Sequence, residues 1–160
     1  MTSAAVISQR ALPRSAVVSV VLVVAAAALT ALAAQWRIHL PFTPVPITGQ
    51  TFAVLLTGAA LGWKLGGAGQ GLYVAVGALG APVFTDASGG LEVLTGATGG
   101  YIIGFVFAAS LVGWMAEHRQ DRTFATMFTA FILGSTVIYG FGVTGLILTA
   151  DMTATGAVEA

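Results

Sequence analysis

The stretch Pro41-Phe42-Thr43-Pro44-Val45-Pro46-Ile47-Thr48-Gly49-Gln50 lies between two long apolar runs and contains three prolines and no charged residue. Each proline fixes its own φ near about −65° and disfavours helical geometry at the residue before it. This segment, called the proline strap below, is therefore predicted to be stiff, extended backbone in an otherwise helical chain. Its mixture of apolar and hydrogen-bonding side chains suits the lid of a binding site better than a solvent loop.

The composition on both sides of the strap is that of a membrane protein. Of the 160 residues, 57% are apolar and 8% are charged, and six basic residues balance six acidic ones. There is no basic patch for nucleic acid. Two histidines and no cysteine leave little for a metal site. We expect one membrane domain over residues 1–160, surrounded by lipid, with no metal and no nucleic-acid partner.

The apolar runs predict an all-α, polytopic membrane helical bundle. Five spans are expected, over residues 16–34, 47–63, 65–80, 99–116 and 124–149. An alternative takes the first run as a signal peptide ending in Ala31-Leu32-Ala33. A retained span is the simpler account, because everything downstream is equally apolar.

The basic residues predict the orientation of these spans in the cell membrane. With a cytoplasmic N-terminus, alternation places Arg37 outside and the other five basic residues inside, namely Arg10, Arg14, Lys64, Arg119 and Arg122. The proline strap and residues 81–98 then both lie on the outer face.

The second outer segment is rich in glycine, which permits close backbone approach to a ligand. An ordinary connector is the alternative. Asp86 and Glu92 lie in this segment without a candidate nucleophile, so catalysis is not expected. No glycine cluster ends in Gly-Lys-Ser/Thr, so a nucleotide-binding loop is not expected.

Two further features leave their roles open. Ala27, Ala31 and Ala34 form a small-residue face on the first span, suited either to packing within the chain or to another membrane subunit. Tyr139, inside the fifth span, either lines a cavity or bonds to a neighbouring helix.

Three stretches together resemble the BioY family, the biotin-binding S components of energy-coupling factor transporters. They are the strap with the residues that follow it, to Gly58; Gly77-Ala78-Leu79-Gly80-Ala81-Pro82-Val83-Phe84; and Gly99-Gly100-Tyr101-Ile102-Ile103-Gly104-Phe105. The resemblance runs from about Ala16 to the end of the chain.

The resemblance implies a six-helix subunit that captures biotin, its transported substrate, from the outer face. It also implies a transmembrane coupling subunit and cytoplasmic ATPase subunits as partners. ATP hydrolysis would then belong to those ATPases, and this chain would be neither an enzyme nor the holder of a cofactor. A structural membrane subunit without a ligand of its own is the alternative.

The resemblance also assigns residues. It implies a lid from the strap, Ser88 near the ureido ring, and the alanine face against the coupling subunit. The full set of implied ligand-binding residues is Phe42, Thr43, Val45, Pro46, Thr48, Gln50, Ser88, Gly89, Gly90, Gly99, Gly100, Tyr101 and Tyr139.

The chain departs from the family pattern after Gly140-Phe141-Gly142-Val143. The family continues there into a loop with a Pro-Phe-x-x-Gly-Asp-x-x-Lys motif and then a sixth helix. The Asp and Lys of that motif are expected to contact biotin. Neither has a counterpart here, so a C-terminally truncated chain with five of six spans is expected.

Overall fold

The structure is a computed structural model that describes residues 15–38, 47–118 and 124–149. Residues Phe42, Thr43, Val45 and Pro46 of the proline strap lie outside these ranges. The elements in chain order are α2 (Ala16–Ala34), β1 (Arg37–Ile38), β2 (Ile47–Thr48), α3 (Gln50–Ala78), the 3-10 helix η1 (Thr85–Ala87), α4 (Leu91–Leu94), α5 (Gly99–His118) and α6 (Phe124–Thr149).

The described part of the chain is the helical bundle that its composition predicts. Four of its helices, α2, α3, α5 and α6, are long and apolar enough to cross a membrane. Ser15 is the N-cap of α2. Its hydroxyl accepts a hydrogen bond from the Val18 N–H at 3.3 Å.

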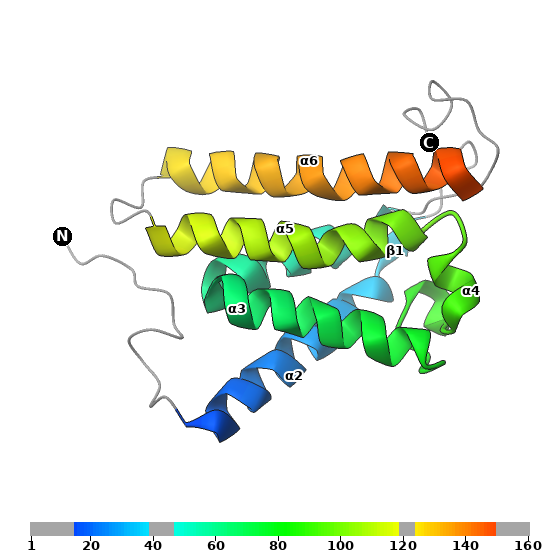
Figure 1. Cartoon of the computed structure of the whole chain (residues 1–160), viewed down its shortest axis with the longest axis horizontal. Coiled ribbons are helices and arrows are strands. Elements are labelled where there is room, and N and C mark those ends of the chain that lie inside the picture. The colour runs from blue at the N-terminus through cyan, green and yellow to red at the C-terminus, as the bar shows by residue number, and fades with distance from the viewer. Residues whose placement is uncertain (1–14, 39–46, 119–123, 150–160) are drawn as a thin grey trace.

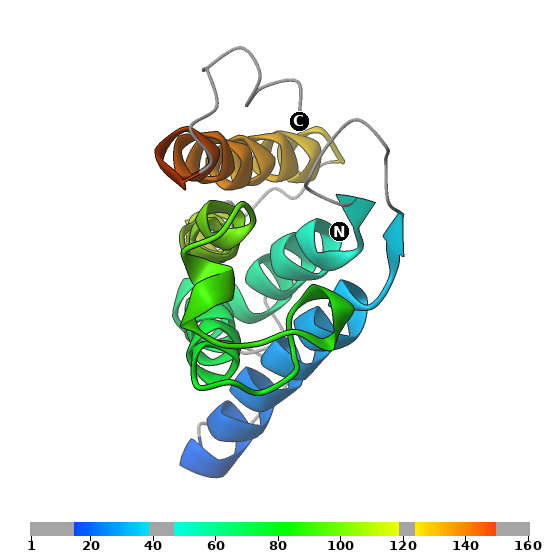
Figure 2. The ribbon, with the colours of Figure 1, turned by 90° about the vertical axis from the view of Figure 1, so that its right-hand side faces the viewer.

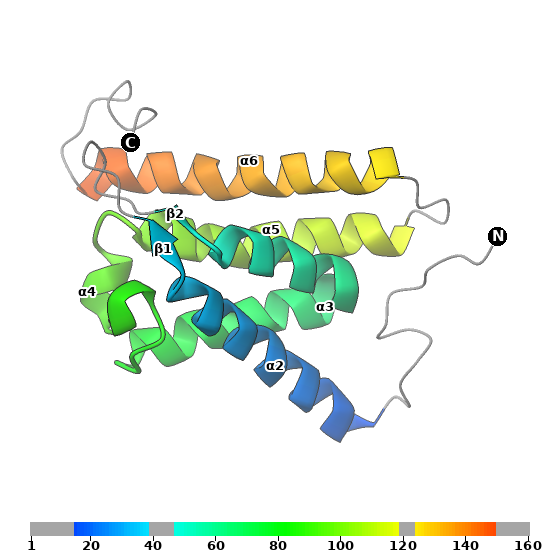
Figure 3. The same cartoon turned by 180° about the vertical axis from the view of Figure 1, so that it is seen from behind.

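Helix α3 reverses direction at Gly62, so it consists of two arms, residues 50–61 and 63–78. Gly62 has φ 82° and ψ 176°, a conformation that glycine adopts without the steric cost of a Cβ. Beyond the turn, Gly66 packs so closely on Gly58 that a Cβ on Gly66 would lie 2.9 Å from the Gly58 Cα. Figure 3 shows the first arm leaving β2 and the second arm returning toward α4.

The reversal separates the second and third predicted spans near the expected boundary, but the arms are short. At about 1.5 Å per residue they measure roughly 18 and 24 Å, against roughly 30 Å for a hydrocarbon core. The number of membrane crossings and their orientation therefore stay predictions.

Helix α5 is the centre of the bundle. It packs against both α3 and α6, while α2 crosses the outer side of α3 obliquely (Figures 1 and 2). Small residues make these contacts close. Gly58 meets the backbone of Ala109 on α5, and Gly104 of α5 meets Ile138 on α6.

A buried polar triad joins α2 to both arms of α3. The Gln70 amide nitrogen donates to the Thr57 hydroxyl at 3.0 Å and to the Thr30 hydroxyl at 3.1 Å. All three side chains are buried. Among the described residues, no buried side-chain nitrogen or oxygen lacks a hydrogen-bond partner, as expected where an unpaired polar group is costly.

The alanine face of α2 is used inside the chain. Ala27 and Ala34 are buried, and Ala31 packs partly buried against the core. A contact of these three side chains with the coupling subunit stays a prediction. The alternative that the sequence left open, packing within the chain, fits their burial.

Candidate functional site at the loop end of the bundle

The second segment predicted to face outside, residues 81–98, lies at one end of the bundle, together with the described last residues of the proline strap, Ile47 to Gln50. This loop end contains β1, β2, η1 and α4, the start of α5 and the end of α6 (Figures 1 and 3). The strands β1 and β2 pair antiparallel, with Arg37 opposite Thr48 and Ile38 opposite Ile47. This two-residue ladder was not predicted, and it pairs residues just before the proline strap with residues near the C-terminal end of the strap.

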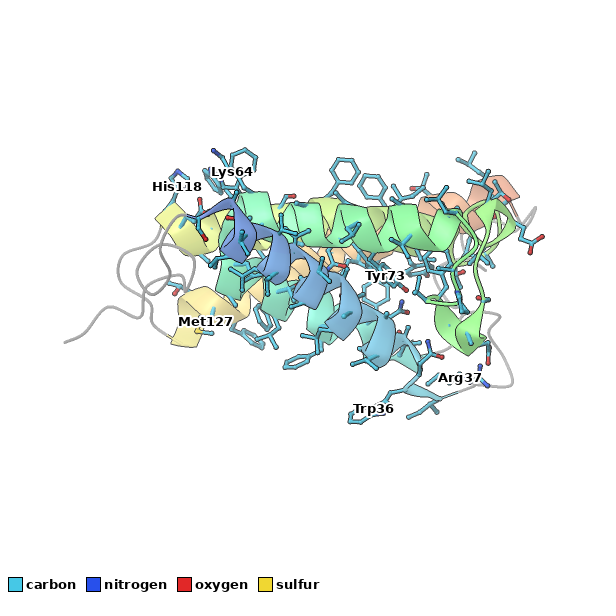
Figure 4. The ribbon with its side chains drawn as sticks, turned by 90° about the horizontal axis from the view of Figure 1, so that it is seen from below. Trp36, Arg37, Lys64, Tyr73, His118 and Met127 are labelled. Carbon is cyan, nitrogen blue, oxygen red and sulfur yellow. The ribbon has the colours of Figure 1, made fainter. Side chains whose placement is uncertain are left out.

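Gln50 connects three parts of the loop end. Its amide nitrogen donates to the Tyr73 hydroxyl at 2.6 Å, and its amide oxygen accepts from Thr48 at 3.0 Å and from Thr85 at 3.3 Å. Gln50 is only 5% exposed and Tyr73 1%. Figure 4 shows Tyr73 within the bundle near the loop end. The buried Gln50 side chain therefore holds β2, the segment at Thr85 and the second arm of α3 together by hydrogen bonds.

Phe84 anchors the second outer segment. Its ring is 1% exposed and packs edge to face on Tyr73, with centroids 5.4 Å apart. The space it fills exists because residue 77 is glycine, and a Cβ there would collide with the Phe84 ring. The residues after Phe84 are thus attached to the core through a buried aromatic contact.

Ser88, Gly89 and Gly90 form the turn that follows this anchor. The Ser88 hydroxyl donates to the Thr85 carbonyl at 2.6 Å, so it closes the turn. Gly90 has φ 102° and its N–H donates to the Gly77 carbonyl at 2.7 Å. In this structure the three residues shape the backbone of the loop.

The glycines that begin α5 serve packing. Gly99 lies against the Leu94 carbonyl, and Gly100 lies against the α6 backbone at Gly145 and Phe141. These contacts allow α5 to approach its neighbours closely, and the implied part of Gly99 and Gly100 in binding the ligand stays a prediction.

Tyr101 lies directly after these glycines and meets α6 through its ring. It packs edge to face on Tyr139, with centroids 6.0 Å apart, and against Gly142. The structure thus brings the two predicted tyrosines together from different helices.

An open groove of about 820 Å³ runs between the first arm of α3 and α6. Its walls combine aromatic and aliphatic side chains with hydroxyl groups, the mixture expected where a small ligand is held by apolar contact and a few polar groups. The lining residues are Thr48, Thr51, Phe52, Leu55, Phe128, Phe131, Ile132, Ser135, Thr136, Tyr139, Gly140 and Val143.

Of the predicted site residues, Thr48 and Tyr139 line this groove. Gln50 and Tyr101 contact those two from behind. The other lining residues were missed, although the α6 wall has a readable signal. From Phe128 to Val143 its members follow the spacing i, i+3, i+4, i+7, i+8, which places them on one helix face.

Two charged side chains of the loop end form an ion pair. Arg37 pairs with Asp86. Within residues 15–38, 47–118 and 124–149, no three His, Cys, Asp or Glu side chains gather in a way that could hold a metal ion.

Comparisons with known proteins agree with one another. The model of the BioY family matches residues 4–160. The "Biotin transporter BioY" of Thermotoga maritima is 42% identical over 106 residues, which cover 66% of this chain and 62% of that protein. The protein of the same name from Rhizobium etli is 34% identical over 134 residues, covering 79% of this chain and 72% of the relative.

A solved structure shares the fold. The S-component for biotin from an ECF-type ABC transporter superimposes with a TM-score of 0.82 at 23% identity, covering 89% of this chain and 78% of that one. This chain therefore spans about three fifths to four fifths of the length of these relatives.

Proposed function

Since the chain belongs to the BioY family, we propose that it is the substrate-binding subunit of a biotin uptake system, and that it captures biotin at the loop end. The relatives named above are biotin transporters. The observation that carries the proposal for this chain is the open groove between the first arm of α3 and α6, with hydroxyl groups along apolar walls.

The chemistry of biotin suits this groove. Biotin has a fused ring system with a polar ureido edge, an apolar chain and a terminal carboxylate. Thr48 and Tyr139 supply hydrogen-bonding groups near the loop end of the groove, while Phe52 and Ile132 supply apolar contact area. We propose that the ring system lies against the Tyr139 side of the groove.

The residues behind the groove give its rim a fixed shape. Gln50 holds Thr48 by a hydrogen bond, and Tyr101 supports the Tyr139 ring. Preorganised groups of this kind lower the conformational cost of binding. Ser88 and the strap residues belong to the proposal as implied by the family resemblance.

Partners and orientation are also proposed. The chain would lie in the cell membrane as a multi-pass protein with its N-terminus in the cytoplasm. It would work with a transmembrane coupling subunit and cytoplasmic ATPase subunits, which would supply the hydrolysis. Its relatives are transporters rather than enzymes, which supports a role in binding without catalysis.

Equilibrium binding of radiolabelled biotin to the purified chain in detergent tests the proposal. Saturable binding that unlabelled biotin displaces, and that a vitamin without a ureido ring does not, is expected. Binding that does not saturate would contradict it and leave the alternative of a structural membrane subunit.

A further inference from the structure

The junction between α2 and β1 holds the second outer segment through Gln35. The amide nitrogen of Gln35 donates to the Phe84 carbonyl at 3.1 Å, and its amide oxygen accepts from the Ala87 N–H at 3.3 Å. One side chain thus brackets residues 84–87 from outside the loop. Because Gln35 is far from this loop in sequence, these bonds fix tertiary structure.

Arg37, two residues further on, pairs with Asp86 at the middle of the bracketed segment. The side chains are 35% and 48% exposed, so the pair remains accessible to dissolved ions. Figure 4 shows Arg37 at the loop end, beside the green loop that follows α3.

The backbone that Arg37 and Gln35 hold is in an uncommon conformation. Asp86 has φ 65° and Ala87 has φ 50°, values that residues with a Cβ seldom adopt without support from their surroundings. The contacts from Gln35 and Arg37 provide that support. Without these contacts, the positive φ values of Asp86 and Ala87 would be less well stabilised.

This segment is linked to the groove in two ways. Thr85 donates to Gln50, which in turn bonds to Thr48 on the groove rim. Arg37 itself lies opposite Thr48 in the β1–β2 ladder. A shift of Arg37 or of the loop would therefore move a residue that lines the groove.

We propose that Gln35 and Arg37 are positioning residues for ligand capture, which hold residues 84–88 and the groove rim in the binding shape without touching the ligand. The proposal rests on the proposed function. It assigns Arg37 a different task from direct pairing with the carboxylate of biotin, because the guanidinium already has Asp86 as its anionic partner.

The test compares biotin with its primary amide, which lacks the carboxylate, on the full chain in detergent at low salt. The variants are Arg37→Gln, Asp86→Asn, the double variant and the exchanged pair Arg37→Asp with Asp86→Arg. Glu92→Gln is the matched control, since Glu92 is an exposed carboxylate of α4, close in sequence to Asp86.

Each single substitution is expected to weaken both ligands alike, by about three- to five-fold, the scale of a partly exposed ion pair. The double variant should bind no worse than either single one, and the exchanged pair should recover part of the loss. High salt should reduce the difference between wild type and variants. Glu92→Gln should leave affinity unchanged.

Other outcomes separate the possibilities. If Arg37→Gln weakens biotin alone and Asp86→Asn changes nothing, Arg37 contacts the carboxylate and the positioning role is wrong. If wild type binds and no variant differs from it, the positioning role also fails while the proposed function stands. If wild type does not bind biotin, both fail.

Discussion

The Gln50 amide nitrogen and the Tyr73 hydroxyl lie 2.6 Å apart, on opposite arms of α3. This bond joins the first turn of one arm to the middle of the other, close beneath the loop end. The same glutamine also accepts a hydrogen bond from Thr48. The position of Thr48 on the groove rim therefore depends on how the two arms of α3 pack together.

Replacing Gln50 by alanine is expected to lower both stability and biotin affinity. The change removes three side-chain hydrogen bonds and leaves the buried Tyr73 hydroxyl without this donor. A cost of about 1–3 kcal/mol is expected for a buried polar group left unpaired. Thermal unfolding in detergent measures it, with Thr129→Ala as the control because that hydroxyl is exposed and bonds only within its helix. Equal unfolding midpoints for the two variants would contradict this role.

Replacing Gly62 by alanine is expected to disrupt the α3 hairpin. The positive φ of Gly62 disfavours any Cβ, and a methyl group there would also collide with the Glu117 carboxylate. That carboxylate accepts from the Trp63 N–H at 3.2 Å and so caps the second arm. A loss of about 1–3 kcal/mol is expected from backbone strain alone.

Gly71→Ala is the matched control for this change. Gly71 belongs to the same helix and has open space where a Cβ would lie, so alanine there should be neutral or slightly stabilising. Both stabilities can be read from thermal unfolding in detergent. A smaller loss at residue 62 than at residue 71 would show that the reversal does not depend on glycine.

Charging the buried triad is expected to be more harmful than making it apolar. Gln70→Leu leaves the Thr30 and Thr57 hydroxyls bonded to carbonyls of their own helices, so a loss of about 1–2 kcal/mol is expected. Gln70→Glu places a carboxyl group at a fully buried position and should cost more. The yield of folded protein from membranes and its unfolding midpoint rank the two, and the reverse order would contradict a dry, closed triad.

The ring and the hydroxyl of Tyr139 can be separated. Tyr139→Phe keeps the edge-to-face contact with Tyr101 and removes one hydrogen-bonding group from the groove, whereas Tyr139→Ala removes both. We expect alanine to weaken biotin binding at least about ten-fold and phenylalanine to weaken it less. Phe107→Ala, on the face of α5 where Phe107 stacks with Phe141, should leave binding unchanged. Titration with labelled biotin compares them, and equal affinity for all three would remove Tyr139 from the site.

The sequence predicted the helical class and the glycine-rich break between α3 and α5 because these depend on local composition. Long apolar runs require helices in a membrane, and prolines and glycines interrupt them. The hydrogen bonds that shape the site, by contrast, join residues that are far apart in the sequence. Gln50 and Tyr73 are separated by 23 positions, and Thr30 and Gln70 by 40. No local pattern marks such pairs, which exist only once α3 folds back.

The alanine face of α2 also shows what local sequence patterns leave open. Small-residue spacing on α2 indicated a close helix contact, which the structure has, but spacing cannot name the partner helix. Gly62 was similarly hidden, since it is one of several glycines in α3 and differs from them by its φ value and its place against Glu117. The α6 wall of the groove, from Phe128 to Val143, has a readable helical spacing, but apart from Tyr139 its residues were not predicted.

The central claim is that biotin binds in the groove between α3 and α6, and filling the groove tests it most directly. Gly140 lines the groove and has open space where a Cβ would lie, so Gly140→Phe adds a ring without disturbing the core. Gly71→Phe adds the same ring at an open position that does not line the groove. In parallel equilibrium titrations with labelled biotin, we expect Gly140→Phe to lose saturable binding while wild type and Gly71→Phe keep it. Wild-type affinity in a folded Gly140→Phe protein would contradict the account.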